Sequence, residues 1–401
     1  MKIAQVAPLF ERVPPELYGG TEGVVSYLTE ALIDLGHDLT LFASGDSITR
    51  ARLIPGSKSA LRLRGNAVKD SIALHVAMLG KLLKNVEEYD LIHFHIDYLH
   101  LPFLQQLPVS FLTTMHGRLD ISELQAVFRQ FPSAPVVSIS NSQRKPLAWA
   151  NWIGTVYHGL PEKNLTFSPK PEDYLAFLGR ICPEKGLARA IEIACRGGLP
   201  LKIAAKVDAV DREYFNSVIE PLLRNPHVEF IGEIGQAEKA AFLGGARALL
   251  FPIDWPEPFG LVMIEALACG TPVVAFDCGS VPEIIEDGRS GYVVSNVADA
   301  IEAVQKIDRL DRAMCRRSFL ERFTARRMAK DYLALYQELI GASESATVSP
   351  RIPCSSGLLS CSGQNGRFEE MPMNNRSDEP ELGAPISGSG SSFSAIGSGV
   401  S

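Results

Sequence analysis

Short apolar segments that alternate with helical patterns are the feature that most restricts how this 401-residue chain can fold. Five expected strands come first, at residues 2–7, 38–43, 90–95, 109–115 and 135–139. Five more follow a proline-containing stretch, at residues 174–178, 201–205, 228–231, 248–251 and 272–276. Strands that alternate with helices form parallel sheets through right-handed crossovers. The two series therefore predict an α/β protein with two doubly wound, Rossmann-like domains.

The same pattern predicts where the domains begin and end. We expect an N-terminal domain over residues 1–165, a second domain over 166–323, and a final helix over 324–341 that packs across the two. Residues 342–401 differ in composition, because 28 of these 60 are Ser, Gly or Pro. So few apolar residues cannot offset the entropy of ordering, and we expect a disordered tail there.

Charge and hydropathy exclude several classes of protein. The 39 Lys and Arg against 46 Asp and Glu give a net charge of −7, which offers no broad basic surface to a nucleic acid. No run of apolar residues is long enough to span a membrane, and the apolar N-terminal segment is too short for a signal peptide. Seven cysteines without metal-knuckle spacing are typical of free thiols in a reducing compartment. We therefore expect a cytoplasmic enzyme that binds no nucleic acid.

A pair of glycines, Gly19 and Gly20, precedes the first expected helix, at residues 21–35, for which Thr21 is the expected N-cap. Glycines at a helix N-terminus let backbone N–H groups approach an anion, and the helix dipole assists. A tight turn without a ligand explains the same pair. The loop before the pair is long for a strand–helix connection, which favours a functional role.

The second stretch of interest runs from Gly179 to Gly186 and contains Arg180 and Lys185. It follows a strand and opens a helix, so both cations can converge on a diphosphate at that helix terminus. Two solvated loop cations are the alternative.

The third stretch contains two carboxylates, Glu257 and Glu265, eight positions apart. They share a face if the residues between them are helical. Glu265 has apolar neighbours on both sides, and a buried carboxylate is costly without a partner. A ribose hydroxyl or a structural ion pair would each supply one.

Taken together, these three stretches resemble the retaining glycosyltransferases of the GT-B fold, in the large "glycosyl transferases group 1" family, which is family four of the glycosyltransferases. The resemblance covers about residues 1–340. Its most specific part is the Glu-x7-Glu block from Glu257 to Glu265, with Pro-Phe-Gly and Gly-Thr-Pro-Val-Val extensions.

The resemblance implies roles for the matching residues. Arg180 and Lys185 would hold the donor's diphosphate and stabilise the charge that develops as it leaves, Glu257 would contact the transferred sugar, and His116 would lie at the reaction centre. We do not assign Glu257 as a nucleophile. The remaining donor-binding residues implied in this way are Gly20, Glu233, Ile234, Phe259, Gly260, Leu261 and Glu265.

Three further residues are candidates. Lys206 stands where the family usually has Gly, and it is either a third cation near the donor or a surface residue. His95 is expected to reach the cleft. Glu283, in a loop that also resembles the family, is expected to support the site.

The segment His93-Phe94-His95-Ile96-Asp97 offers a competing interpretation. Two imidazoles and a carboxylate at this spacing resemble part of the zinc site of metallo-β-lactamase-like hydrolases. The usual next residue there is His, whereas this chain has Tyr98. A zinc-dependent hydrolase is therefore a minor alternative.

The main expectation is a metal-independent glycosyltransferase that retains anomeric configuration and needs no cofactor. Its donor would be a UDP-, GDP- or ADP-linked sugar, and its acceptor a carbohydrate, lipid-linked or small molecule. A sugar-nucleotide epimerase or hydrolase on the same fold is the alternative, followed by a non-catalytic nucleotide-sugar-binding protein. Six basic residues between 50 and 69 could give weak contact with an anionic membrane, although a solvated basic face explains them too.

Overall fold

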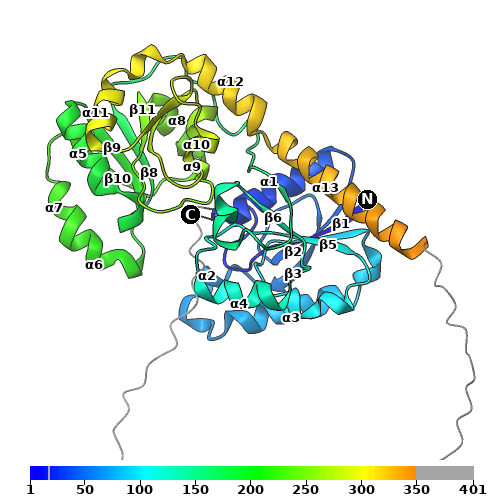
Figure 1. Cartoon of the computed structure of the whole chain (residues 1–401). Coiled ribbons are helices and arrows are strands. Elements are labelled where there is room, and N and C mark those ends of the chain that lie inside the picture. The colour runs from blue at the N-terminus through cyan, green and yellow to red at the C-terminus, as the bar shows by residue number, and fades with distance from the viewer. Residues whose placement is uncertain (17–18, 349–401) are drawn as a thin grey trace, which may run out of the picture.

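The computed structural model describes residues 1–16 and 19–348 and contains two α/β domains, each built on a parallel sheet (Figure 1). The N-terminal domain comprises β1 (Lys2–Val6), α1 (Gly20–Asp34), β2 (Asp38–Ser44), β3 (Arg52–Ser57), α2 (Leu61–Arg64), α3 (Ser71–Leu83), β4 (Leu91–Phe94), β5 (Ser110–Thr114), α4 (Ser122–Gln130), β6 (Val136–Ser138) and β7 (Trp152–Thr155). Its strand order is β3-β2-β1-β4-β5-β6-β7.

The C-terminal domain comprises β8 (Leu175–Arg180), α5 (Leu187–Gly197), β9 (Leu201–Lys206), α6 (Arg212–Tyr214), α7 (Glu220–Leu222), β10 (Val228–Gly232), α8 (Gln236–Gly245), β11 (Ala248–Phe251), α9 (Leu261–Ala268), β12 (Val273–Phe276), α10 (Val281–Ile284), β13 (Gly291–Val294), α11 (Val297–Gln305) and α12 (Arg312–Arg322). Its strand order is β10-β9-β8-β11-β12-β13. Both sheets thus have the doubly wound order, which reverses direction between β1 and β4 in one domain and between β8 and β11 in the other.

These two reversal points explain where a ligand can bind. The connections that leave neighbouring strands on opposite faces open a crevice at the carboxyl ends of those strands. The Gly19–Gly20 turn follows β1, and the Arg180–Gly186 loop follows β8. The predicted fold is confirmed, and its topology places the chemically interesting loops at the two crevices.

Three strands were not predicted, and each is the edge of a sheet: β3, β7 and β13. Edge strands pair on one side only, so they need no continuous apolar run. β3 even contains Pro55, which an edge tolerates because a proline cannot donate to a ladder.

The last helix, α13 (Ala325–Val348), leaves α12 and runs back over the N-terminal domain (Figure 1). Its Met328, Tyr332 and Tyr336 are fully buried and pack in the same cluster as Ile3 and Leu112 of the first sheet. The predicted crossing helix is therefore present, and it continues beyond residue 341. Residues 349–401, which make up most of the predicted tail, lie outside the described residues.

The expected N-cap of α1 is wrong. The helix begins one residue earlier, and its N-cap is Gly19, which provides no side-chain hydrogen bond. The Thr21 hydroxyl is instead buried within the first turn. The first backbone N–H groups of α1 therefore receive no cap from a side chain of the N-cap residue.

Candidate active site

A cavity of about 450 Å³ lies between the two domains and is lined from both sides. From the N-terminal domain come residues at the start of α1, including Gly20. From the C-terminal domain come the ends of β8 and β9 and the starts of α8 and α9. The predicted residues that line it are Gly20, Arg180, Lys185, Lys206, Glu233, Ile234, Gly260, Leu261 and Glu265.

Lys185, which lines the cavity, forms an ion pair with Glu257, which is fully buried and is not among the lining residues. Nζ of Lys185 lies 2.6 Å from Oε2 of Glu257, and their side chains are 11% and 0% exposed. The Trp255 indole donates a second hydrogen bond of 2.9 Å to the same oxygen. The other oxygen, Oε1, is buried without a hydrogen-bond partner among the described residues. An unsatisfied buried acceptor is costly, so this oxygen is suited to accept a hydrogen bond from a ligand.

Two glycines allow this pair to form. Gly186 has φ +71°, and a Cβ added there would lie 2.0 Å from the backbone oxygen of Pro252. Gly279 has φ +60°, and its Cβ would lie 2.3 Å from the backbone nitrogen of Glu257. Glycine is therefore required at both positions by left-handed backbone and by close approach. The first contact brings the loop of Lys185 against the loop after β11.

Arg180 and Lys206 line the cavity beside two aspartates that the sequence reasoning missed. Nζ of Lys206 lies 3.1 Å from Asp208, and the Arg180 guanidinium lies 3.8 Å from Asp208 and 3.6 Å from Asp211. Burial raises the pKa of the Asp211 carboxyl, and the nearby Arg180 partly offsets that rise. The separations at Arg180 are longer than those of close hydrogen-bonded ion pairs.

Glu265 has a cationic partner on α8. Its Oε1 lies 2.7 Å from Nζ of Lys239, which also lines the cavity. Of the two partners expected for Glu265, an ion pair or a ribose hydroxyl, the structure shows the ion pair, and Glu265 also lines the cavity. The condition for a shared helical face is not met, because α9 begins at Leu261 and Glu257 lies in the loop before it.

Three helix N-termini contribute lining residues to the cavity: Gly20 of α1, Gln236 of α8, and Leu261 with Val262 of α9. The first N–H groups of a helix lack partners within the helix and carry a partial positive charge. Together with Arg180, Lys185 and Lys206 they offer several positive groups to an anion, although Glu30, Glu233 and Glu265 also line the cavity. Phe259 does not line it; its ring is buried beneath, 1% exposed.

His116 and His95 lie in a buried row of imidazoles next to Phe259. His116 Nε2 is 2.8 Å from His95 Nδ1, and the rings of His116 and His158 are stacked at 5.3 Å. The His158 ring in turn lies 4.9 Å from that of Phe259, in the other domain. Burial lowers the pKa of His116 to about 3, so the ring is neutral at pH 7. Neither residue is among those that line the cavity.

The zinc alternative is wrong on geometry. Both ring nitrogens of His93 are occupied, by Tyr336 at 2.7 Å and Thr114 at 2.7 Å, and those of His95 by Gln5 and His116. Asp97 adopts a left-handed backbone conformation with φ 52°. Within residues 1–16 and 19–348, no group of three His, Cys, Asp or Glu side chains is arranged to hold a metal ion.

Glu283 joins the two domains and does not line the cavity. Its carboxylate accepts hydrogen bonds from the backbone N–H groups of Asn141 and Ser142, at 2.7 Å each. The Asn141 amide and the Tyr157 hydroxyl add bonds of 3.1 and 3.0 Å. A carboxylate from α10 thus caps a helical turn of the N-terminal domain.

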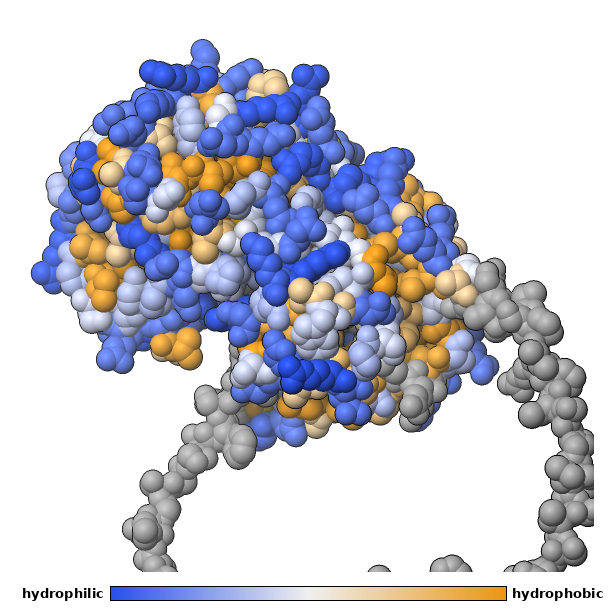
Figure 2. Space-filling model, in the orientation of Figure 1, coloured by the Kyte–Doolittle hydropathy of each residue, from blue (hydrophilic) through white to orange (hydrophobic). Residues whose placement is uncertain are grey.

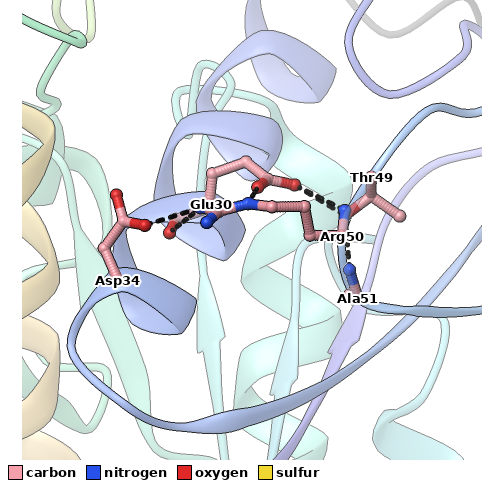
Figure 3. Close-up of polar contacts among 5 residues, drawn as sticks. All are labelled: Glu30, Asp34, Thr49, Arg50 and Ala51. Atoms are coloured by element: carbon pink, nitrogen blue, oxygen red, sulfur yellow. Dashed lines mark hydrogen bonds and ion pairs between the residues drawn. The ribbon is translucent and has the colours of Figure 1, made fainter.

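Three of the six basic residues between 50 and 69 form ion pairs. Arg50 lies between Glu30 and Asp34 of α1 (Figure 3) and donates to both carboxylates. Although burial raises the pKa of Glu30, hydrogen bonds from Arg50 and Thr49 outweigh it and lower that pKa. Arg52 and Arg62 are paired with Glu88 and Glu11.

On the face drawn in Figure 2 hydrophilic side chains predominate, and hydrophobic ones form separate patches. No helix in the described part of the chain is long and apolar enough to cross a membrane.

Known structures and sequences define the class. Sucrose-phosphate synthase from Thermosynechococcus elongatus has a TM-score of 0.69 at 20% identity, over 85% of this chain and 99% of that one. Anabaena Alr3699/HepE in complex with UDP-glucose has a TM-score of 0.63 at 16% identity, over 84% and 100%. A phosphatidyl-myo-inositol mannosyltransferase from Mycobacterium leprae is 26% identical over 348 residues, or 77% of this chain and 88% of that one. The fold and these relatives define a glycosyltransferase of GT-B architecture.

Two family models then cover the two domains in succession. The model described as "Glycosyltransferase Family 4" matches residues 18–176, and the model described as "Glycosyl transferases group 1" matches residues 162–315. The chain belongs to the group 1 glycosyltransferase family.

Proposed function

We propose that this glycosyltransferase transfers a sugar from a nucleotide-sugar donor to an acceptor hydroxyl with retention of configuration and without a metal ion. The observation that carries the proposal is the cavity in which Arg180, Lys185 and Lys206 meet three helix N-termini. A leaving nucleoside diphosphate develops negative charge, and preorganised cations and N–H groups at that point lower the barrier. Cations fixed by the protein can supply what a divalent ion supplies elsewhere.

The two carboxylates divide the donor between them in this proposal. Glu257 Oε1, buried and unpartnered, accepts a hydroxyl of the transferred sugar, while Lys185 holds Oε2 and also faces the diphosphate. Glu265, fixed by Lys239, accepts a ribose hydroxyl. The nucleobase packs near Glu233 and Ile234, which line the same cavity. Alr3699/HepE in complex with UDP-glucose supports a nucleotide sugar as donor.

The N-terminal domain supplies the acceptor side. In this proposal Gly20 at the start of α1 lies near the phosphates or the transferred sugar, and His116, which does not line the cavity, acts at the reaction centre. Contact with an anionic membrane or lipid-linked acceptor receives little support from the basic stretch, because Arg50, Arg52 and Arg62 are already ion-paired.

Binding and turnover test the proposal separately. UDP-, GDP- and ADP-sugars are screened by thermal shift, since a ligand of the folded state raises its stability with occupancy. The stabilising donor is then incubated with candidate acceptors in the presence of EDTA. Acceptor-dependent release of nucleoside diphosphate, with an α-linked product from an α-linked donor, is the expected result. Epimer formation without an acceptor, or turnover abolished by EDTA and restored by a divalent ion, would contradict it.

The matched control uses two lysines of the C-terminal domain. Lys185→Met should abolish donor stabilisation and most turnover. Lys202→Met should leave both unchanged, because Lys202 on β9 faces Glu172 and Tyr174 away from the cavity.

A further inference from the structure

A chain of buried hydrogen bonds runs from Gln5 on β1 through His95 to His116. Gln5 Oε1 lies 2.6 Å from His95 Nε2, and His95 Nδ1 lies 2.8 Å from His116 Nε2. The three side chains are 0%, 2% and 4% exposed. They come from the neighbouring strands β1, β4 and β5 or the residues just after them. The carboxyl edge of the first sheet thus holds three polar groups in one fixed line.

His93 and its hydrogen-bond partners pack against this chain of hydrogen bonds. The ring of His93 lies 4.0 Å from that of His95. His93 is itself held at both nitrogens, by Tyr336 of α13 and by Thr114 of β5. The packing of His93 against His95, together with hydrogen bonds at both nitrogens of His95, favours the observed orientation of the His95 ring.

Both linked imidazoles are neutral at pH 7. Burial lowers the pKa of His95 well below its usual value, with a further contribution from neighbouring histidines, and it lowers the pKa of His116 to about 3. A neutral imidazole carries a proton on one nitrogen and a lone pair on the other. Because His95 and His116 share a hydrogen bond, the nitrogen that carries the proton in His95 determines which nitrogen carries it in His116.

The amide oxygen of Gln5 fixes the tautomer of His95, because a carbonyl oxygen only accepts hydrogen bonds. His95 must carry its proton on Nε2 and present a lone pair at Nδ1. His116 must then donate from Nε2, which leaves the lone pair on its Nδ1. That atom is buried and has no hydrogen-bond partner among the described residues.

We propose that Gln5, acting through His95, is a positioning residue that fixes the tautomer of His116 so that its Nδ1 meets the substrate as an acceptor only. The inference rests on the proposed role of His116 at the reaction centre. It also narrows the substrate: the group that meets Nδ1 must donate a hydrogen bond, as a sugar hydroxyl does. A carboxylate or carbonyl oxygen there would face a lone pair with no proton between them, so a uronic-acid group is selected against.

The tautomer is measured directly by ¹⁵N NMR on the full chain labelled at histidine. The His116 resonances are assigned by their loss in His116→Gln. We expect Nε2 of His116 to carry the proton and Nδ1 to be unprotonated in the wild type. Observation of the opposite tautomer, with the proton on Nδ1, overturns the proposal. This result needs no substrate, so it stands whether or not the proposed reaction is correct.

A pair of variants tests the consequence. Gln5→Met should mix or invert the His116 tautomer and lower kcat by about 10- to 100-fold with little change in donor KM, as for other groups that orient a ligand-contacting residue. The control is Thr113→Val, which removes a 2.8 Å bond to the buried His100 outside this row. It should change neither the tautomer nor kcat. An unchanged tautomer in Gln5→Met, or a changed tautomer with wild-type kcat, contradicts the proposal.

The two hypotheses fail in different ways. If His116→Gln transfers sugar at the wild-type rate, the proposed role of His116 at the reaction centre is wrong. If that variant is inactive but the wild-type tautomer is the reverse of the one expected, only the role of Gln5 is wrong.

Discussion

The ammonium nitrogen of Lys185 lies 2.6 Å from a carboxylate oxygen of Glu257, although 72 positions separate the two residues. One residue follows β8 and the other follows β11, and these two strands are neighbours in the C-terminal sheet. The topological reversal of the sheet therefore brings opposite charges together beside the cavity between the two domains. Because Glu257 is fully buried, neither charge can be removed without consequence for the other.

This pair predicts a non-additive double-mutant cycle. Lys185→Met should destabilise the protein by about 3–5 kcal/mol, because it leaves a buried carboxylate uncompensated. The double variant Lys185→Met/Glu257→Gln should recover part of that loss, since the remaining amide is neutral. Urea unfolding of the four proteins measures the coupling. Additive losses would mean that the pair is not energetically coupled.

Gly186 and Gly198 have similar backbone conformations, yet we expect substitution by alanine to lower the stability of the protein by different amounts. Gly186 and Gly198 both have left-handed φ, at +71° and +72°. Gly198→Ala meets nothing within 4 Å and should cost about 1–2 kcal/mol for its conformation alone. Gly186→Ala adds a clash with Pro252 and should cost more, with a loss of transferase activity through displacement of Lys185. Equal unfolding free energies for the two variants would contradict the close approach.

The Glu283 carboxylate predicts a measurable link between the domains. Glu283→Gln weakens the hydrogen bonds accepted from Asn141 and Ser142 and should speed amide hydrogen exchange at residues 141–142 by about 10-fold, as expected from a loss of about 1–2 kcal/mol. Glu286→Gln, a neighbour that pairs with Arg289 and Arg322 of its own domain, is the control and should leave that exchange unchanged. Unchanged exchange in Glu283→Gln would show that the capped turn does not depend on this contact.

The buried histidines predict loss of stability in mild acid. Burial lowers the pKa of His116 and His100 to about 3, whereas the unfolded chain binds these protons near pH 6.5. Between these values the unfolded state binds more protons, so the free energy of unfolding falls as pH falls, by up to about 1.4 kcal/mol per pH unit for each such histidine. Urea unfolding between pH 7.5 and 5.5 measures the slope. His100→Gln should reduce it by one histidine's share, and an unchanged slope would contradict the assignment.

Central elements of the fold could be predicted from sequence because their environment dictates their composition. Strands such as β11, buried on both faces, must be continuous apolar runs. The missed strand β7 is half-exposed throughout, and its residues carry no such signature. Of the four edge strands only β10 was predicted, at residues 228–231, so apolar runs identify central strands better than edge strands.

The candidate site was predictable in part of its residues, because Glu257 and His116 do not line the cavity, and it was not predictable in its pairings. Motif positions such as Arg180 and Glu265 do line the cavity. Lys239 could not be found, because it is an ordinary lysine on a helix until α8 packs beside α9 and brings it within 2.7 Å of Glu265. The contacts of Glu283 with Asn141 and Ser142 could not be predicted either, because they depend on how the two sheets are placed. Such pairings are properties of tertiary structure.

The return of α13 to the first domain has a consequence for biosynthesis. Tyr332 and Tyr336 complete the polar core around Thr114 and His93, yet they are translated after the entire second domain. A nascent chain that has emerged only to residue 165 still lacks these partners, and the apolar surface that α13 covers remains open to water. The first domain to leave the ribosome is therefore the last to be completed, and the active enzyme cannot form before its C-terminal helix has been made.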